Sequence, residues 1–128
     1  GESTSPREDA PLAEAFLYVG GHPNRAVQRL LDRFARSGFK ITHAGDLDPE
    51  GILILQEVMD AAGAKVEPLR MDARTFDAYR DHSRELEKTA LARVALIRDD
   101  TRALPGIESL LERILSTGRG VEQEIVEY

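Results

Sequence analysis

Residues 39–54 read FKITHAGDLDPEGILI, and this stretch points to the fold class by itself. Its first six residues include two that are β-branched, which favours a strand. Pro49 suits the first turn of a helix, and Asp48 before it is a good N-cap. The apolar run that continues to Met59 predicts a helix that is buried on most sides and ends near Gly63.

The same alternation extends to both sides of this stretch. Residues 15–19 are apolar and predict a buried strand, and Asn24 is a suitable N-cap for a helix that ends at Gly38. Residues 65–70 predict a third strand. The order strand, helix, strand, helix, strand indicates a parallel sheet with right-handed crossovers. We therefore expect an α/β protein with a Rossmann-like sheet of three or four strands and helices on both faces.

The second half of the chain predicts a helical extension that wraps the sheet. Residues 73–88 are expected to be helical, whereas residues 90–97 leave helix and strand open. Pro105 begins another predicted helix, which Gly118 ends. Residues 121–128 are expected to form a last short helix.

The length and composition indicate a single domain without disulfides. The chain has 128 residues and no cysteine, which excludes disulfides, thiolate chemistry and cysteine zinc sites. No apolar run is long enough to cross a bilayer, and residues 1–12 predict a disordered leader or linker rather than a signal peptide. We expect a cytoplasmic protein with no membrane partner, a domain over residues 13–128, and a place at the C-terminus of a longer chain.

The charge balance limits how this chain would meet DNA. It has 17 basic and 23 acidic side chains, a net charge of −6. Proteins that bind nucleic acid on their own usually carry a basic surplus, because neutralising phosphates supplies most of their affinity. If this chain acts on DNA, a metal ion must offset its local carboxylates and other domains must do most of the binding.

Two aspartates mark a candidate metal site where the second strand ends. Asp46 and Asp48 lie at the carboxyl end of a strand, the edge at which α/β sheets bind ligands. Magnesium, or manganese in its place, takes a few carboxylate oxygens and keeps waters for a substrate phosphate. Gly45 and Gly51 would let the backbone approach that phosphate. The plainer alternative is an Asx turn with an N-cap and no metal.

Several other polar side chains are weaker candidates. Glu50, in the first helical turn, could reach the metal through a water, although the helix dipole alone favours an acid there. Glu124, with Glu122 nearby, could be a further ligand, or belong to a charged surface helix. His22 and His43 sit near strand ends, where they could contact phosphate or only bond loop backbone.

One helix carries a row of basic side chains. Arg25, Arg29, Arg33 and Arg36 fall on one helical face and could contact a DNA backbone, although such rows are more often solvated. Asp72 ends the third predicted strand, where it could join the cleft or cap the next helix.

Several stretches of the sequence resemble a known fold. Residues 39–54 resemble the second acidic motif of the toprim fold, which topoisomerases, primases and several nucleases share. Residues 19–27 and 43–46 resemble more closely a group of bacterial proteins with a C-terminal toprim domain, behind a part similar to the A subunit of type IIB topoisomerases. The nuclease subunit of the Wadjet plasmid-defence systems looks related. Residues 70–76 and the Glu-Gln-Glu element at 122–124 also resemble that group.

This resemblance, good over residues 15–80, implies a magnesium-binding toprim domain of a DNA strand-cleaving enzyme. DNA would be reached through the full-length protein, and a homodimer is compatible with the family. A toprim domain also needs a Glu at the end of its first strand, but Gly20 and Gly21 stand there and Glu14 precedes the strand. Either that strand lies upstream of this chain or the site is degenerate, so the catalytic group is unassigned and the isolated chain is expected to be inactive.

Two other functions compete with this interpretation. A non-catalytic toprim remnant would serve as a structural or partner-binding module. A receiver-like or phosphatase-like phosphoaspartate domain would also place acids after strands. However, Pro49-Glu50-Gly51 does not match the phosphatase pattern, and we find no lysine after a late strand as a receiver requires.

Overall fold

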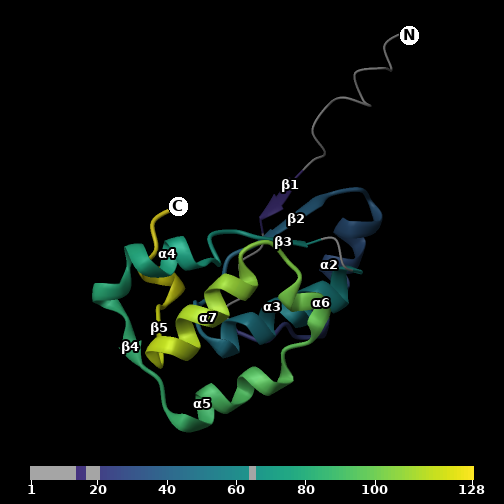
Figure 1. Cartoon of the computed structure of the whole chain (residues 1–128). Coiled ribbons are helices and arrows are strands. Elements are labelled where there is room, and N and C mark those ends of the chain that lie inside the picture. The colour runs from purple at the N-terminus through teal and green to yellow at the C-terminus, as the bar shows by residue number, and fades with distance from the viewer. Residues whose placement is uncertain (1–13, 17–20, 64–65) are drawn as a thin grey trace.

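The computed structural model describes residues 14–16, 21–63 and 66–128. The predicted leader at 1–12, and residues 17–20 of the first predicted strand and its end, lie outside the described residues. Three strands form a parallel sheet in the order of the sequence (Figure 1). They are β1 (Glu14–Phe16), β2 (Lys40–His43) and β3 (Val66–Pro68). The predicted mixed α/β class with a small parallel sheet is confirmed.

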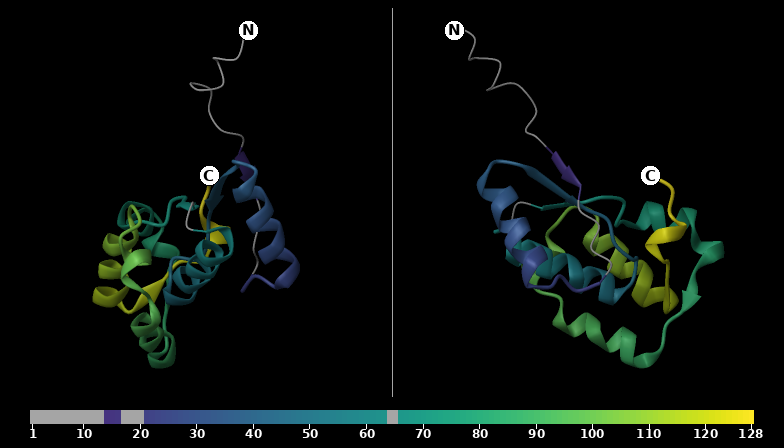
Figure 2. Two further views of the ribbon diagram at one scale, coloured as in Figure 1. Left: turned by 90° about the vertical axis from the view of Figure 1, so that its right-hand side faces the viewer. Right: turned by 180° about the vertical axis from the view of Figure 1, so that it is seen from behind.

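Two helices connect these strands and lie against each other. They are α2 (Arg25–Arg36) and α3 (Pro49–Ala62). Because the strands neighbour one another in sequence order, right-handed crossovers place both helices on the same face of the sheet. The second half of the chain then packs against α3, which lies between it and α2 (Figure 2). The expected arrangement of helices on both faces, wrapped by the second half, is therefore replaced by layers stacked outward from one face.

The predicted helix boundaries near the acidic loop are confirmed by their caps. Asn24 accepts a hydrogen bond from the Val27 amide at 2.9 Å, so it is the N-cap of α2. Asp48 accepts one from the Gly51 amide at 2.7 Å and caps α3. Gly63 ends α3 in the left-handed region at φ 75°, where glycine has no steric penalty.

Helix α3 is the centre of the core, as its apolar sequence predicts. Its inward residues meet α2 and the sheet, and others meet the second half of the chain. Fully burying one such aliphatic side chain contributes about 1.5–3 kcal/mol. Its buried residues are Pro49, Gly51, Ile52, Leu53, Leu55, Val58, Met59 and Ala62.

The second half is largely helical, as expected. Its elements are α4 (Ala73–Ala78), η1 (Arg80–His82), β4 (Arg84–Glu85), α5 (Lys88–Ala92), η2 (Arg93–Leu96), α6 (Asp99–Arg102), α7 (Ile107–Thr117), β5 (Arg119–Gly120) and η3 (Gln123–Ile125). The helical alternative for residues 90–97 is the one observed, and Gly118 ends α7 as predicted. No helix in the described part of the chain is long and apolar enough to cross a membrane.

Two predictions for this half are wrong. Residues 73–88 do not form one helix, because α4 ends at Ala78 and β4 pairs antiparallel with β5. Residues 80–85 are all polar, so no apolar stripe holds them in a helix, and pairing with a distant strand prevails. Residues 121–128 do not form the predicted helix: Val121 bridges to Leu47 in the acidic loop, and only Gln123–Ile125 form a 3-10 turn.

Candidate functional site

The acidic loop, defined as Gly45–Gly51, leaves the carboxyl end of β2 and enters α3. The C-terminal segment, defined as residues 119–128, lies directly against it. The Leu47 amide donates to the Val121 carbonyl at 2.7 Å, and the Val121 amide donates back at 3.1 Å. Both side chains are fully buried. The loop is therefore fixed by a strand-like contact with residues more than seventy positions away.

This contact places Asp46 against a segment that carries two further carboxylates. The Asp46 Oδ1 accepts a hydrogen bond from the Gln123 amide at 2.7 Å, and Gln123 stands between Glu122 and Glu124. The pKa of Glu124 is raised, chiefly because its protonated carboxyl can donate a hydrogen bond to Glu122, and the negative charges of Glu122 and Asp46 add to this. We call Asp46, Glu122 and Glu124 the carboxylate cluster. It concentrates negative charge at the carboxyl end of β2.

Asp48 has a different environment from Asp46. Its side chain is buried, Oδ1 caps α3, and Oδ2 lies 3.4 Å from Nη2 of Arg84. Burial raises the pKa of Asp48, the charges of Asp46 and Glu50 add to this, and the Gly51 amide and Arg84 oppose it. Both carboxylate oxygens are thus engaged by protein groups, and Asp48 holds the loop onto the helix.

Arg84 lies between Asp48 and one member of the carboxylate cluster, Glu122. Besides Asp48, it approaches Glu122, with 3.3 Å between Nε and Oε1. Gly120, in β5, lets this arrangement form: a Cβ there would lie 2.9 Å from the Cβ of Asp48 and 3.1 Å from the Leu47 carbonyl oxygen. Sequence analysis missed Arg84, Gly120 and Gln123, because each reaches the loop only through long-range pairing that leaves no local signal.

Glu50 and His22 lie in an ion-pair cluster on α3 rather than with Asp46. Glu50 accepts a hydrogen bond from Nε of Arg93 at 2.6 Å, and its other oxygen contacts Nε2 of His22. The Nδ1 atom of His22 contacts Glu57. The hydrogen bond to Glu57, supported by that to Glu50, raises the pKa of His22 against partial desolvation.

The two loop glycines are explained by close packing. A Cβ at Gly51 would lie 2.0 Å from the Asp46 carbonyl oxygen, and one at Gly45 would lie 2.9 Å from Nε2 of His43. Their predicted contact with phosphate stays a prediction. Arg25 begins α2 and, with Arg29, lines a hollow of about 340 Å³ that contains no residue of the acidic loop.

His43 ends β2 just before the acidic loop. It is only 2% exposed, and Nε2 has no hydrogen-bond partner among the residues that the structure describes. Burial lowers its pKa to about 4. His43 is therefore neutral near pH 7 and belongs to the core beneath the loop.

The predicted metal ligands do not form a complete set in the described residues. Across residues 14–16, 21–63 and 66–128, no group of three or more His, Asp or Glu side chains is placed to hold a metal ion. Asp46 bonds to the residue before Glu124 and its charge acts on Glu124, whereas both oxygens of Asp48 are engaged. Asp72, the remaining acid considered, is the N-cap of α4 and accepts from the Thr75 amide at 2.8 Å.

Comparison with known proteins gives two matches. A family model described as "Protein of unknown function C-terminus (DUF2399)" matches residues 7–127. The chain is also similar to the "Wadjet protein JetD" of Bacillus cereus (strain Q1), with 27% identity over 116 residues. This alignment covers 87% of the chain but 28% of that relative, so the chain spans less than a third of the relative's length.

Proposed function

Because the chain belongs to the DUF2399 family, whose model covers residues 7–127, we propose that it is the metal-binding, toprim-type part of an enzyme that cuts or transfers DNA strands. The observation that carries this proposal is the carboxylate cluster at the carboxyl end of β2. That edge is where α/β sheets bind their ligands. The similarity to the Wadjet protein JetD supports a DNA-related defence context.

The carboxylate cluster suits a hard divalent cation. Carboxylate oxygens are the ligands that magnesium and manganese prefer. The raised pKa of Glu124 reflects crowded negative charge, which a divalent cation would relieve. Asp46 and Glu124 are the residues that would hold the ion, with Glu122 beside them. When bound, the ion would polarise a phosphoryl oxygen and stabilise a leaving 3′-oxygen.

In this proposal Asp48 acts first as a positioning residue. The hydrogen bond of Asp48 to the Gly51 amide and its contact with Arg84 fix the acidic loop, and thereby the position of Asp46 within it. A direct bond from Asp48 to the ion would require one of these partners to be released. The buried Asp48 therefore supports the loop, and the exposed carboxylates of the C-terminal segment complete the site.

The general acid or base is not supplied by Glu14. Glu14 is the first residue of β1, and β1 runs parallel to β2. Its backbone thus lies at the opposite edge of the sheet from the acidic loop. We expect the 128 residues alone to bind metal without cutting DNA, with the remaining catalytic group and most DNA contacts provided elsewhere in the full-length protein.

A non-catalytic module that binds a partner is the second candidate. It is favoured by the engagement of both Asp48 oxygens and by the lack of a three-ligand group in the described residues. The test is cleavage of supercoiled plasmid by the full-length protein with magnesium, or with a chelator, beside Asp46→Asn and the distant surface control Asp99→Asn. Cleavage that requires metal, is lost with Asp46→Asn and persists with Asp99→Asn is the expected result. Cleavage that continues in Asp46→Asn would refute the site.

A further inference from the structure

A hollow of about 430 Å³ lies at the carboxyl end of β3, beside α4. It is lined by Arg70, Asp72, Arg74, Thr75, Ala78 and Tyr79. The sequence 70–76 contributes most of this lining, and the proposed metal site makes no use of it. We call this feature the arginine hollow.

Arg70 is held in place on both its backbone and its side chain. Its φ of 55° lies in the left-handed region, which is uncommon for a residue other than glycine and is found disproportionately at functional sites. Its Nη1 donates to the Glu127 carbonyl at 2.7 Å. Its guanidinium carbon lies 5.6 Å from the centre of the Tyr128 ring, a cation–π contact. The guanidinium group of Arg70, which is one of the lining residues, is thus fixed by the C-terminal segment.

The charge of the hollow is not neutralised by its surroundings. Within the described residues, neither Arg70 nor Arg74 forms an ion pair with a carboxylate. By contrast, most other arginines of the second half have one: these are Arg80, Arg84, Arg93, Arg98, Arg102 and Arg113. The one acid in the lining, Asp72, caps α4 but keeps its charge. Two arginines and one aspartate therefore leave the lining with a surplus of one positive charge, in a chain of net charge −6.

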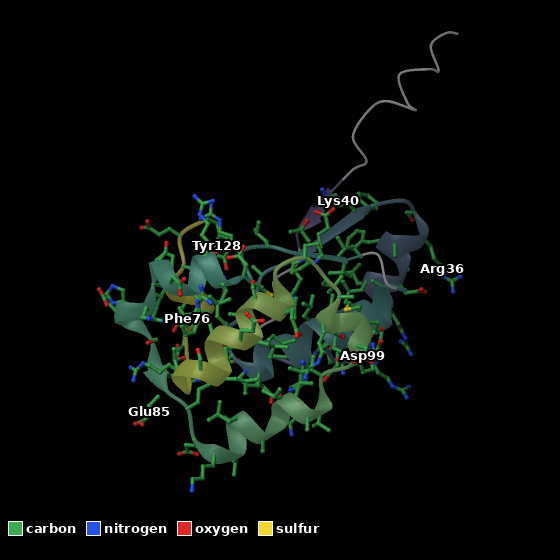
Figure 3. All side chains as sticks on the ribbon, in the orientation of Figure 1. Arg36, Lys40, Phe76, Glu85, Asp99 and Tyr128 are labelled. Carbon is green, nitrogen blue, oxygen red and sulfur yellow. The ribbon has the colours of Figure 1, made fainter. Side chains whose placement is uncertain are left out.

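The C-terminal segment connects this hollow with the carboxylate cluster. The Glu127 amide donates to the Tyr79 hydroxyl at 3.0 Å, and four residues earlier the Gln123 amide donates to Asp46. Figure 3 places Tyr128 at the α4 end of the molecule, away from Asp99 and Arg36. The C-terminal segment is thus bonded both to two residues that line the hollow, Arg70 and Tyr79, and to Asp46.

We infer that the arginine hollow binds a phosphate group of a DNA strand and holds that strand beside the carboxylate cluster. The substrate class rests on the proposed function, whereas the anion site rests on the hollow itself. Guanidinium groups match phosphate oxygens in charge and in planar geometry. Arg70 and Arg74 act as positioning residues for the strand.

The test measures strand binding by the 128-residue chain with a chelator present, so that metal takes no part. Fluorescence anisotropy follows a labelled single-stranded oligonucleotide, beside one of the same sequence with uncharged methylphosphonate linkages. Inorganic phosphate is titrated separately, and the Nε–H signals of arginine are followed by NMR. The variants are Arg74→Gln, Arg70→Lys, and the matched control Arg80→Gln, whose arginine is outside the lining and pairs with Asp77.

Arg74→Gln is expected to weaken binding of the charged strand about tenfold. It should also reduce the slope of log affinity against log salt concentration by about one, as expected for the loss of one phosphate contact. Arg70→Lys keeps the charge but loses the planar fork, so a smaller loss is expected. Arg80→Gln should bind as the parent does. Unchanged amide spectra in each variant show that the fold is retained.

Three results would overturn the inference: equal affinity of Arg74→Gln and Arg80→Gln, equal binding of the uncharged strand, or signal shifts with inorganic phosphate but no strand binding. The metal proposal is tested apart from it. Asp46→Asn should leave metal-free strand binding intact. An Arg74→Gln variant that binds the strand as tightly as the parent refutes the hollow, whereas metal titration and metal-dependent cleavage test the carboxylate cluster.

Discussion

Replacing His43 by leucine is expected to remove a defined part of the pH dependence of folding. The unfolded chain binds the histidine proton with a pKa near 6.5, and burial lowers the folded value to about 4. Each pH unit between them corresponds to about 1.36 kcal/mol, so the full difference is about 3.4 kcal/mol. The folded state favours neutral His43, so this stability is present above pH 6.5 and is lost as the pH falls toward 4.

Between pH 7 and pH 4.5 the loss due to His43 comes to about 2.4 kcal/mol of unfolding free energy. Urea unfolding at these two pH values measures it, because the difference between the parent and His43→Leu isolates this group from the titrating carboxylates. His82→Gln, a change at an exposed histidine, is the matched control and should retain the parental pH dependence. If His43→Leu loses as much stability as the parent over this range, the assignment of His43 as a buried neutral group is wrong.

Two further predictions concern the loop and its neighbours. Gly51→Ala should lower the unfolding free energy by at least about 2 kcal/mol, since the new Cβ would lie 2.0 Å from the Asp46 carbonyl oxygen, whereas Gly21→Ala meets no atom within 4 Å and should change it by less than about 0.5 kcal/mol. An NMR titration should give His22 a midpoint above its ordinary 6.5, and Glu57→Gln should lower that midpoint; an unchanged midpoint in the variant would exclude Glu57 as the main cause.

The first half of the fold was predictable because its signals are local. Asn24 and Asp48 are each followed by the residues that their caps require, and Gly63 ends α3 where the apolar run stops. The apolar character of α3 on most sides correctly indicated a helix packed between two layers. These features depend on residues within a few positions of one another.

The rest depended on contacts that no local pattern reports. Residues 80–85 carry no apolar periodicity, so nothing in their sequence announces that β4 pairs with β5. The bridge between Leu47 and Val121 prevented the expected C-terminal helix and brought Glu124 toward Asp46. Sequence reasoning selected Asp46, Asp48 and Glu124 as candidate ligands, and their metal binding stays a prediction. The tertiary structure adds that Asp48 caps α3 and that the residue before Glu124 bonds to Asp46.

The same contacts explain why both halves of the described chain contribute to one edge of the sheet. The acidic loop, the hollow after β3 and the C-terminal segment all meet at the carboxyl ends of β2 and β3. The segment is held by backbone hydrogen bonds to Leu47 and through Tyr79. Its position therefore links the proposed metal site to the arginine hollow.

The central claim is that Asp46 and Glu124 bind a divalent cation together. Calorimetric titration of the chain at pH 7 with magnesium and manganese tests it most directly, beside Asp46→Asn, Glu124→Gln and the surface control Asp99→Asn. We predict binding in the parent and in Asp99→Asn, weakened at least about tenfold in each of the other two variants. Equal affinity in Asp46→Asn, or no binding by the parent at millimolar metal, would contradict the metal site and favour the non-catalytic module.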